Sequence, residues 1–136
     1  MARPWHAEQL TSGLIVVSHH RPIHEVSVVD KNGLVVTSYA NAGAGRLKLR
    51  APKQLVVLTN GCILVADSGN DRIVALNPSL SCIHVSSIPV DGGLKGPSTL
   101  HVDESRGRLY IGEYDAGRLL AYDYFVNDSC KLHEHS

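Results

Sequence analysis

Aromatic residues are scarce in this sequence of 136 residues, with one Trp, one Phe and five Tyr making up 5% of the chain. Neither sign of charge is in excess, because 13 Lys and Arg balance 13 Asp and Glu. Many dedicated nucleic-acid-binding domains are strongly basic, and base stacking needs aromatic side chains. The composition therefore argues against a dedicated nucleic-acid binder, although a local basic patch would suffice for binding.

Cysteine is also rare, and the three present, Cys62, Cys82 and Cys130, form no CxxC pair. An odd number without such spacing indicates neither a disulfide framework nor a structural zinc site, so we expect reduced thiols. The apolar run 14–17 is far too short for a signal-peptide core or a membrane span, and the segment 1–6 does not look like a leader. These absences predict a cytoplasmic protein that does not bind membranes.

Internal repetition is the main positive signal in the sequence. The segment 49–57 aligns with 94–102, and their prolines are 45 positions apart (97 − 52). Downstream, 61–76 aligns with 107–122 at a spacing of 46 (107 − 61). A weaker copy starts at 13–17, which lies 48 positions before the strand that follows Gly61 (61 − 13). The period of 45 to 48 residues predicts three units, at about 1–45, 46–92 and 93–136.

Each unit has the rhythm of four short strands. In the middle unit we expect strands near 54–58, 61–66, 71–76 and 82–87, with turns at Asn60-Gly61, Ser68-Gly69-Asn70 and Asn77-Pro78. Asn-Gly is typical of tight hairpins in which both central residues have positive φ. No segment has a helical period. The sequence predicts an all-β fold, a partial β-propeller of about three four-stranded antiparallel blades. Because the chain turns polar after Phe125, the last unit is expected to lack a proper fourth strand.

The segment 65–73, Val-Ala-Asp-Ser-Gly-Asn-Asp-Arg-Ile, resembles the core of an NHL repeat, which has a valine-rich strand, Asp, a small turn, Asn, a polar residue, Arg and an aliphatic residue. The third unit keeps Arg118 but has Glu113 in place of the Asp, and the first unit lacks the Asp-to-Arg frame. The chain is thus similar to NHL-repeat β-propellers of animal tripartite-motif proteins, where the propeller is the substrate- or RNA-binding end of a RING-type ubiquitin ligase. The resemblance implies a protein- or RNA-binding scaffold, without the zinc spacing that ligase chemistry requires.

The recurring residues of the repeat are expected to build the blades. Proline has no N–H and suits the start of a strand. A carboxylate paired with Arg across the second turn can hold that turn together, and catalytic residues seldom recur in every blade. The expected structural set is Pro52, Gly61, Asp67, Asn70, Arg72, Pro97, Gly107, Glu113 and Arg118.

One basic cluster occupies 46–53, between the last strand of one blade and the first strand of the next. In propellers this connection lies on the same face as the turn between the second and third strands. We therefore predict a binding surface for RNA phosphates or an acidic protein segment, the alternative being a solvated loop. Its residues are Arg46, Lys48, Arg50, Lys53 and Arg72.

Motifs for catalysis and metal binding are absent from the sequence pattern. Propeller enzymes such as peptide-amidating lyases and lactonases place metal ligands on their inner strands. Here those positions contain Gln54 and Ser98, and His101 is the one titratable residue. We therefore predict that the chain is not an enzyme and has no metal or cofactor. A propeller enzyme of that type and a degenerate structural fragment are the alternatives.

Three blades leave a ring open, because related NHL propellers usually close with about six. The chain is either a fragment of a longer protein or one half of a homodimer that completes a six-bladed ring. The fragment is favoured because nothing in the sequence caps the two ends. A protein is the expected partner, with RNA as the second choice.

Overall fold

The computed structural model describes residues 3–20, 23–39, 47–81, 83–86, 88, 90 and 92–134. Over these residues the chain forms three four-stranded antiparallel sheets, which we call blades 1, 2 and 3. Blade 1 contains β1 (Arg3–Gln9), β2 (Ile15–His20), β3 (Glu25–Val29) and β4 (Val35–Tyr39). Blade 2 contains β5 (Pro52–Val57), β6 (Ile63–Asp67), the 3-10 turn η1 (Ser68–Asn70), β7 (Arg72–Leu76) and β8 (Ile83–Ser86). Blade 3 contains β9 (Pro97–Asp103), β10 (Arg108–Glu113), β11 (Arg118–Val126) and β12 (Leu132–Glu134).

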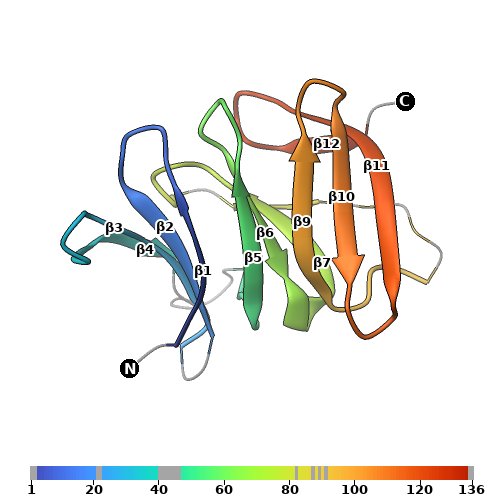
Figure 1. Cartoon of the computed structure of the whole chain (residues 1–136), viewed down its shortest axis with the longest axis horizontal. Coiled ribbons are helices and arrows are strands. Elements are labelled where there is room, and N and C mark those ends of the chain that lie inside the picture. Colours follow the sequence, from blue (N-terminus) through green and yellow to red (C-terminus); the bar gives the residue numbers. More distant parts are fainter. Residues whose placement is uncertain are drawn as a thin grey trace.

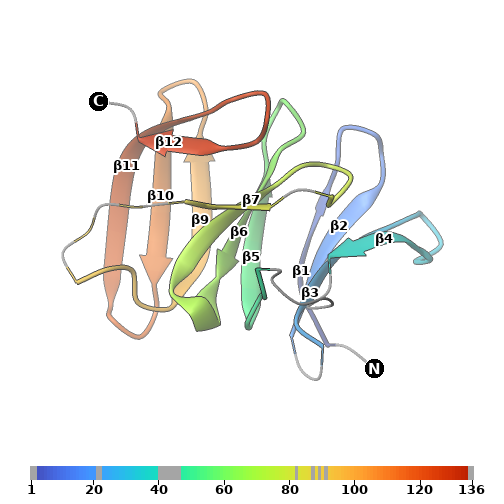
Figure 2. The same cartoon turned by 180° about the vertical axis from the view of Figure 1, so that it is seen from behind.

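The blades stand side by side, and the first strands β1, β5 and β9 are neighbours on one side of the molecule (Figure 1). We call these the inner strands. Seen from behind, the outer strands β4 and β12 lie nearest the viewer (Figure 2). Within every sheet the strand order follows the chain order. The prediction of an all-β fold with about three four-stranded antiparallel blades is confirmed.

Two apolar layers join the blades. In the layer between blades 1 and 2, Val16 and Val28 pack with Ile63 and Leu76. In the layer between blades 2 and 3, the alternate residues of β6 pack against blade 3. Because blade 2 is covered on both faces, all five residues of β6 are buried, and its sequence is apolar at four successive positions instead of alternating.

The turn at Asn60-Gly61 differs from the predicted two-residue hairpin. Gly61 has a φ of +89°, whereas Asn60 does not have positive φ. The Leu58 N–H donates to the Cys62 carbonyl at 2.8 Å, and the Gly61 N–H donates to the Leu58 carbonyl at 2.9 Å. This is a longer hairpin loop closed by one glycine in the left-handed region. Gly13 occupies the same position in blade 1, with a φ of +92°.

Blade 3 does have a fourth strand, which corrects the prediction that it is missing. β12 pairs with the end of β11, with Leu132 opposite Val126. The Asn127 carboxamide oxygen accepts the N–H of Ser129 at 3.2 Å and of Lys131 at 3.0 Å, which turns the chain back. Leu132 then reaches the apolar layer between blades 2 and 3. One buried leucine in a polar segment is too weak a pattern to predict a strand.

Cys62 and Cys130 form a disulfide between blades 2 and 3, with Cα atoms 5.4 Å apart. The prediction of reduced thiols is therefore wrong for this pair, while Cys82 lies outside the described residues. Disulfides are rare in the reducing cytosol, and the cytoplasmic location stays a prediction. Among the described residues, no helix is long and apolar enough to cross a membrane.

Gly69 and Gly112 both leave no room for a Cβ, but they differ in the atoms that an added Cβ would meet. A Cβ at Gly69 would lie 2.6 Å from Arg50 Cγ and 2.7 Å from the Arg50 carbonyl oxygen, and that carbonyl cannot move away because the Gly69 N–H donates to it. A Cβ at Gly112 would instead meet the Thr99 hydroxyl, which belongs to an exposed side chain and not to the backbone. We expect Gly69→Ala to lower the free energy of unfolding by about 2 kcal/mol and Gly112→Ala by less than about 1 kcal/mol, measured by guanidinium denaturation. Equal losses would contradict this difference.

Candidate active site

All three inner strands begin at the same end of the molecule, and Pro4, Pro52 and Pro97 lie at or next to their first residues. We call this the proline end. An inner strand has a neighbour on one side only, so the missing N–H of proline costs no ladder hydrogen bond there. Because the blades are repeats, residues that follow each proline occupy equivalent positions around one axis.

A cavity of about 410 Å³ lies at the proline end. Its walls are the two residues after each proline, namely Trp5, His6, Lys53, Gln54, Ser98 and Thr99. Tyr114, from the turn between β10 and β11, also lines the cavity. Equivalent positions of three blades therefore converge on one hollow, which is where propeller folds hold ligands at their axis.

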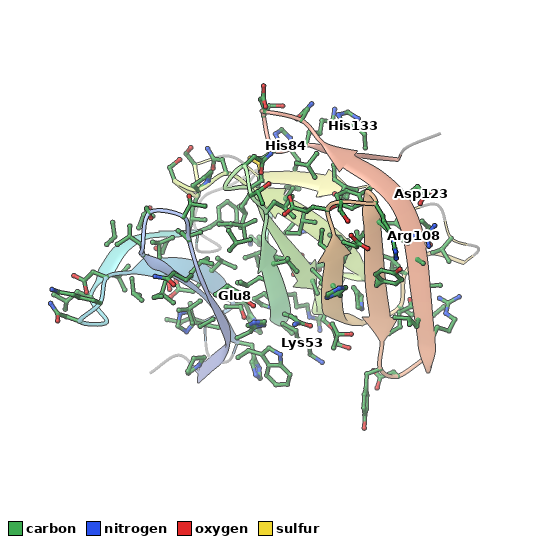
Figure 3. The ribbon with its side chains drawn as sticks, turned by 45° about the horizontal axis from the view of Figure 1, so that its top comes forward. Glu8, Lys53, His84, Arg108, Asp123 and His133 are labelled. Carbon is green, nitrogen blue, oxygen red and sulfur yellow. A yellow bond between two sulfur atoms is a disulfide. The ribbon has the colours of Figure 1, made fainter. Side chains whose placement is uncertain are left out.

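Two aromatic rings and one cation define the character of the cavity. Trp5 from blade 1 is 51% exposed, and Tyr114 from blade 3 is 85% exposed. The Lys53 ammonium lies 5.4 Å from the centroid of the Trp5 ring, within cation–π distance. Figure 3 shows Lys53 near the start of β5, with Glu8 on the neighbouring β1. The cavity can therefore contact an apolar ring and a negative charge at the same time.

His6 supplies a titratable group beside these side chains. Its Nε2 lies 3.1 Å from Glu8 Oε1, so a proton on Nε2 is shared with a carboxylate and the lone pair falls on Nδ1. Two polar neighbours are held by other bonds, because Gln54 Oε1 accepts the Leu100 N–H at 2.9 Å and Ser98 Oγ donates to the Gly112 carbonyl. His6 is thus the residue of the cavity best placed to take up a proton.

A buried carboxylate positions the segment that leads to the cavity. Asp67 Oδ1 accepts the N–H of Arg50 at 2.7 Å, two residues before Pro52. Its Oδ2 accepts bonds from Asn70 Nδ2 at 2.9 Å and from Arg72 Nε at 2.8 Å. Arg72 also donates to the Lys48 carbonyl at 2.8 Å. The Asp-to-Arg motif therefore fixes both the second turn of the blade and the start of its inner strand.

Glu113 repeats this arrangement in blade 3, where it accepts the Lys95 N–H and a bond from Arg118 Nε at 2.6 Å. Burial by itself raises its pKa, but the hydrogen bonds and charges of Arg118 and Lys95 outweigh burial and hold the pKa of Glu113 below its ordinary value of 4.5. A carboxylate with a lowered folded-state pKa contributes stability above its unfolded pKa, and that contribution is lost as the pH falls through the folded-state pKa.

Acid denaturation should reveal this contribution. Below about pH 4.5 the free energy of unfolding is expected to fall more steeply for the wild-type chain than for Glu113→Gln, because the amide has no proton to gain. Urea denaturation at a series of pH values between about 3 and 7 measures both curves. Parallel curves for the two proteins would contradict the assignment.

The predicted basic surface is only partly assembled. Arg72 is ion-paired with Asp67, and Lys53 lies in the cavity beside Trp5. Lys48 and Arg50 are exposed, and Arg46 lies outside the described residues. Binding of RNA or of an acidic segment by these residues stays a prediction.

The other predicted residues lie at strand starts and in turns. Pro52 and Pro97 begin inner strands, and Gly61 and Gly107 have positive φ in the first turns of their blades. The histidines are dispersed, and His24 Nδ1 accepts the Ala51 N–H at 2.9 Å. In the part of the chain that the structure describes, no three His, Cys, Asp or Glu side chains gather as metal ligands do.

Sequence reasoning missed the residues of the cavity that come from blade 1. The prediction rests on the inner-strand positions Gln54 and Ser98, which are not titratable. A signal for blade 1 was present, because Pro4 lies 48 positions before Pro52 (52 − 4), the same offset that separates Gly13 from Gly61. That alignment places Trp5 and His6 at the equivalent inner positions.

No family model matches the chain, and no curated protein matches it. Among solved structures, a catalytically inactive histidine-to-alanine variant of virginiamycin B lyase from Staphylococcus aureus with quinupristin has a TM-score of 0.67 and 15% identity, over 98% of this chain and 41% of that one. A protein of unknown function from Bacteroides caccae has a TM-score of 0.64 and 20% identity, over 96% and 48%. A streptogramin B lyase has a TM-score of 0.62 and 14% identity, over 97% and 54%.

These similarities show the fold, and this chain spans only about half the length of the structures it resembles. They contradict the prediction that the chain is not an enzyme, because two of the structures named here are lyases. The propeller part of the NHL resemblance is supported. The tripartite-motif, ubiquitin-ligase and RNA-binding functions that it implied receive no support from the comparisons.

Proposed function

We propose that this chain forms part of a lyase-type propeller that binds its ligand in the cavity at the proline end. The observation that carries the proposal is the convergence of equivalent inner-strand positions on one cavity, with His6 beside Glu8 and Lys53 beside Trp5. The similarity to lyases supports the proposal at the level of the fold alone.

The residues of the cavity suit an elimination. A base takes a proton from carbon next to an electron-withdrawing group, the electron pair forms a double bond, and the leaving group departs with its own electrons. His6 Nδ1 acts as the base, and Glu8 stabilises the imidazolium that forms. Lys53 stabilises the negative charge that develops on a carbonyl oxygen or on the leaving group. Trp5 and Tyr114 hold an apolar or ring-shaped part of the ligand.

Trp5 makes the proposal testable, because it is the single tryptophan of the chain. Quinupristin, the compound present in one of the similar lyase structures, is the first probe. We expect a saturable change in tryptophan emission and loss of the probe by liquid chromatography. His6→Gln should keep the emission change and slow conversion at least about 100-fold, because it removes only the base.

His101→Gln is the matched control for this substitution. His101 is exposed on β9, next to Tyr110, and does not line the cavity. Its replacement should leave binding and conversion unchanged. The proposal is wrong if the probe leaves tryptophan emission unchanged, or if conversion persists in His6→Gln.

A second candidate function is docking of a protein segment at the proline end, as in NHL-type scaffolds. The observation that favours it is the exposure of Tyr114 next to the cavity, together with the exposed Lys48 and Arg50. Charge reversal at Lys48 and Arg50 should abolish capture of an acidic segment and leave quinupristin binding intact. The two functions are thereby separable.

A further inference from the structure

Blade 3 has a face that no other described blade covers. In blade 2 the corresponding face packs on blade 3 through Leu64, Ala66, Ile73 and Ala75, which are all fully buried. At the repeat spacing of 46, the matching residues of blade 3 are Tyr110, Gly112, Leu119 and Ala121. Leu119 is 73% exposed, although its counterpart Ile73 has no exposed surface. Blade 3 therefore has residues at the positions that pack against a neighbouring blade, but no described blade covers them.

Blade 1 has an uncovered face of the opposite kind. In blade 2 this face packs on blade 1 through Ile63, Val65 and Leu76. Strand register makes Ile15, Val17 and Val29 their counterparts, because Ile15 pairs with Val29 as Ile63 pairs with Leu76. The blade 2 residues are fully buried, whereas the blade 1 residues are only partly buried. The two free faces are thus the two halves of the contact that joins blades within the chain.

The junctions inside the chain share one feature that the free face of blade 3 lacks. His24 Nδ1 accepts the Ala51 N–H at 2.9 Å, and Asp71 Oδ1 accepts the Gly96 N–H at 2.7 Å. Each bond holds the connecting segment that enters the next blade. The counterpart in blade 3 is Gly117, which has no side chain and cannot accept such a bond. A junction between two separate chains needs no such bond, because no connecting segment crosses it.

A second contact recurs at the inner junctions, between the first turn of one blade and the last turn of the next. Leu14 and Leu80 belong to the apolar layer between blades 1 and 2. Cys62 and Cys130 take the same places between blades 2 and 3 and form the disulfide. Leu80 and Cys130 have nearly the same left-handed backbone, with φ of 59° and 60°. The corresponding turns therefore supply two leucines to one junction and a disulfide to the other.

The next contact in this series would place Arg108, the counterpart of Cys62, against the last turn of blade 1, which Asp30 begins. Arg108 now faces Asp123 across β10 and β11, at 3.4 Å on the exposed surface (Figure 3). A cation opposite a turn with a carboxylate is favourable, although Lys31 in the same turn reduces the attraction. The free faces thus carry apolar residues at the positions that pack together inside the chain, and the turns beside them carry Arg108 and Asp30.

We propose that two copies of this chain pack so that the free face of blade 3 in each copy covers the free face of blade 1 in the other. The two junctions close six blades, three from each copy, into one ring. The inner strands of the second copy complete the wall of the cavity at the proline end. One copy covers 41%, 48% and 54% of the similar structures, so two copies together come close to the length of one of them. The proposal rests on the blade repeat and does not depend on the ligand chemistry.

Light scattering on the full chain after size exclusion tests the proposal. We expect a mass of about 29 kDa, twice the 14.7 kDa of one copy. Leu119→Asp should raise the dimer dissociation constant at least about 100-fold, because it buries a charge at the junction. Leu119 is exposed in one copy, so this variant keeps its fold. Val85→Asp, at an exposed apolar position of the middle blade, is the matched control and should leave the dimer intact.

Mixing two variants distinguishes this junction from a symmetric patch. Val17→Asp changes the blade 1 face. Val35→Asp, at a more exposed position on β4 opposite Val29, is a second variant if folding suffers. A mixture of Leu119→Asp with either one restores a single unaltered junction and should dimerise more strongly than each variant alone. A monomeric wild-type chain at about 100 µM, a dimer that survives Leu119→Asp, or particles of more than two copies would each overturn the proposal.

Discussion

Asp67→Ala is expected to lower the free energy of unfolding by about 3 to 5 kcal/mol, because it removes one partner of a buried ion pair. The Asp67 carboxylate is fully buried and accepts bonds from the Arg50 N–H, Asn70 Nδ2 and Arg72 Nε. The Arg72 side chain is 21% exposed, so water can solvate part of the orphaned guanidinium. This partial solvation places the expected loss near the lower end of that range.

Asp67→Asn is the matched comparison, because the amide keeps the volume of the side chain and an oxygen for the Arg50 N–H. Its NH2 group replaces Oδ2 and cannot accept the bonds from Asn70 Nδ2 and Arg72 Nε, so the expected loss is about 2 to 3 kcal/mol. Guanidinium denaturation at neutral pH measures both variants. A loss below about 1 kcal/mol for Asp67→Ala would show that the pair contributes little to the blade.

The repeat made the strands predictable, because each blade must place apolar residues and turn glycines at the same spacing to pack on its neighbour. The strand predicted at 71–76 lies at 72–76, and the proline starts of β5 and β9 follow from the missing N–H. The errors lie where one residue overrides the pattern. Leu132 turns a polar tail into a strand, and one glycine reshapes the Asn60-Gly61 hairpin.

The cavity was less predictable, because its residues do not recur. Recurrence identifies residues that every blade needs, such as Asp67 with Arg72 and Glu113 with Arg118. A site on the axis takes a different side chain from each blade, and only their convergence gives it chemistry. The positions after each proline differ among the three blades, and those are the residues that line the cavity.

The second inner junction depends on its disulfide. Reduction of Cys62–Cys130 is expected to lower the free energy of unfolding by about 4 kcal/mol, because the bond closes a loop with a sequence separation of 68 and restricts the unfolded chain. The two blades would still share their apolar layer, so the reduced protein should remain folded in dilute denaturant. Guanidinium denaturation with and without reductant measures the difference.

Blade 1 suggests the control, because its junction with blade 2 uses Leu14 and Leu80 where the next junction has the two cysteines. The double substitution Cys62→Leu and Cys130→Leu replaces the covalent link by two leucines, the residues found at the equivalent positions between blades 1 and 2. This double variant should unfold at the same denaturant concentration with and without reductant, and should be close in stability to the reduced wild type. The wild-type chain, unfolded without reductant, should show two fewer reactive thiols than after reduction. If all thiols react without reductant, the link is absent, and the junction between blades 2 and 3 is held by packing and hydrogen bonds without a covalent bond, as the junction between blades 1 and 2 is.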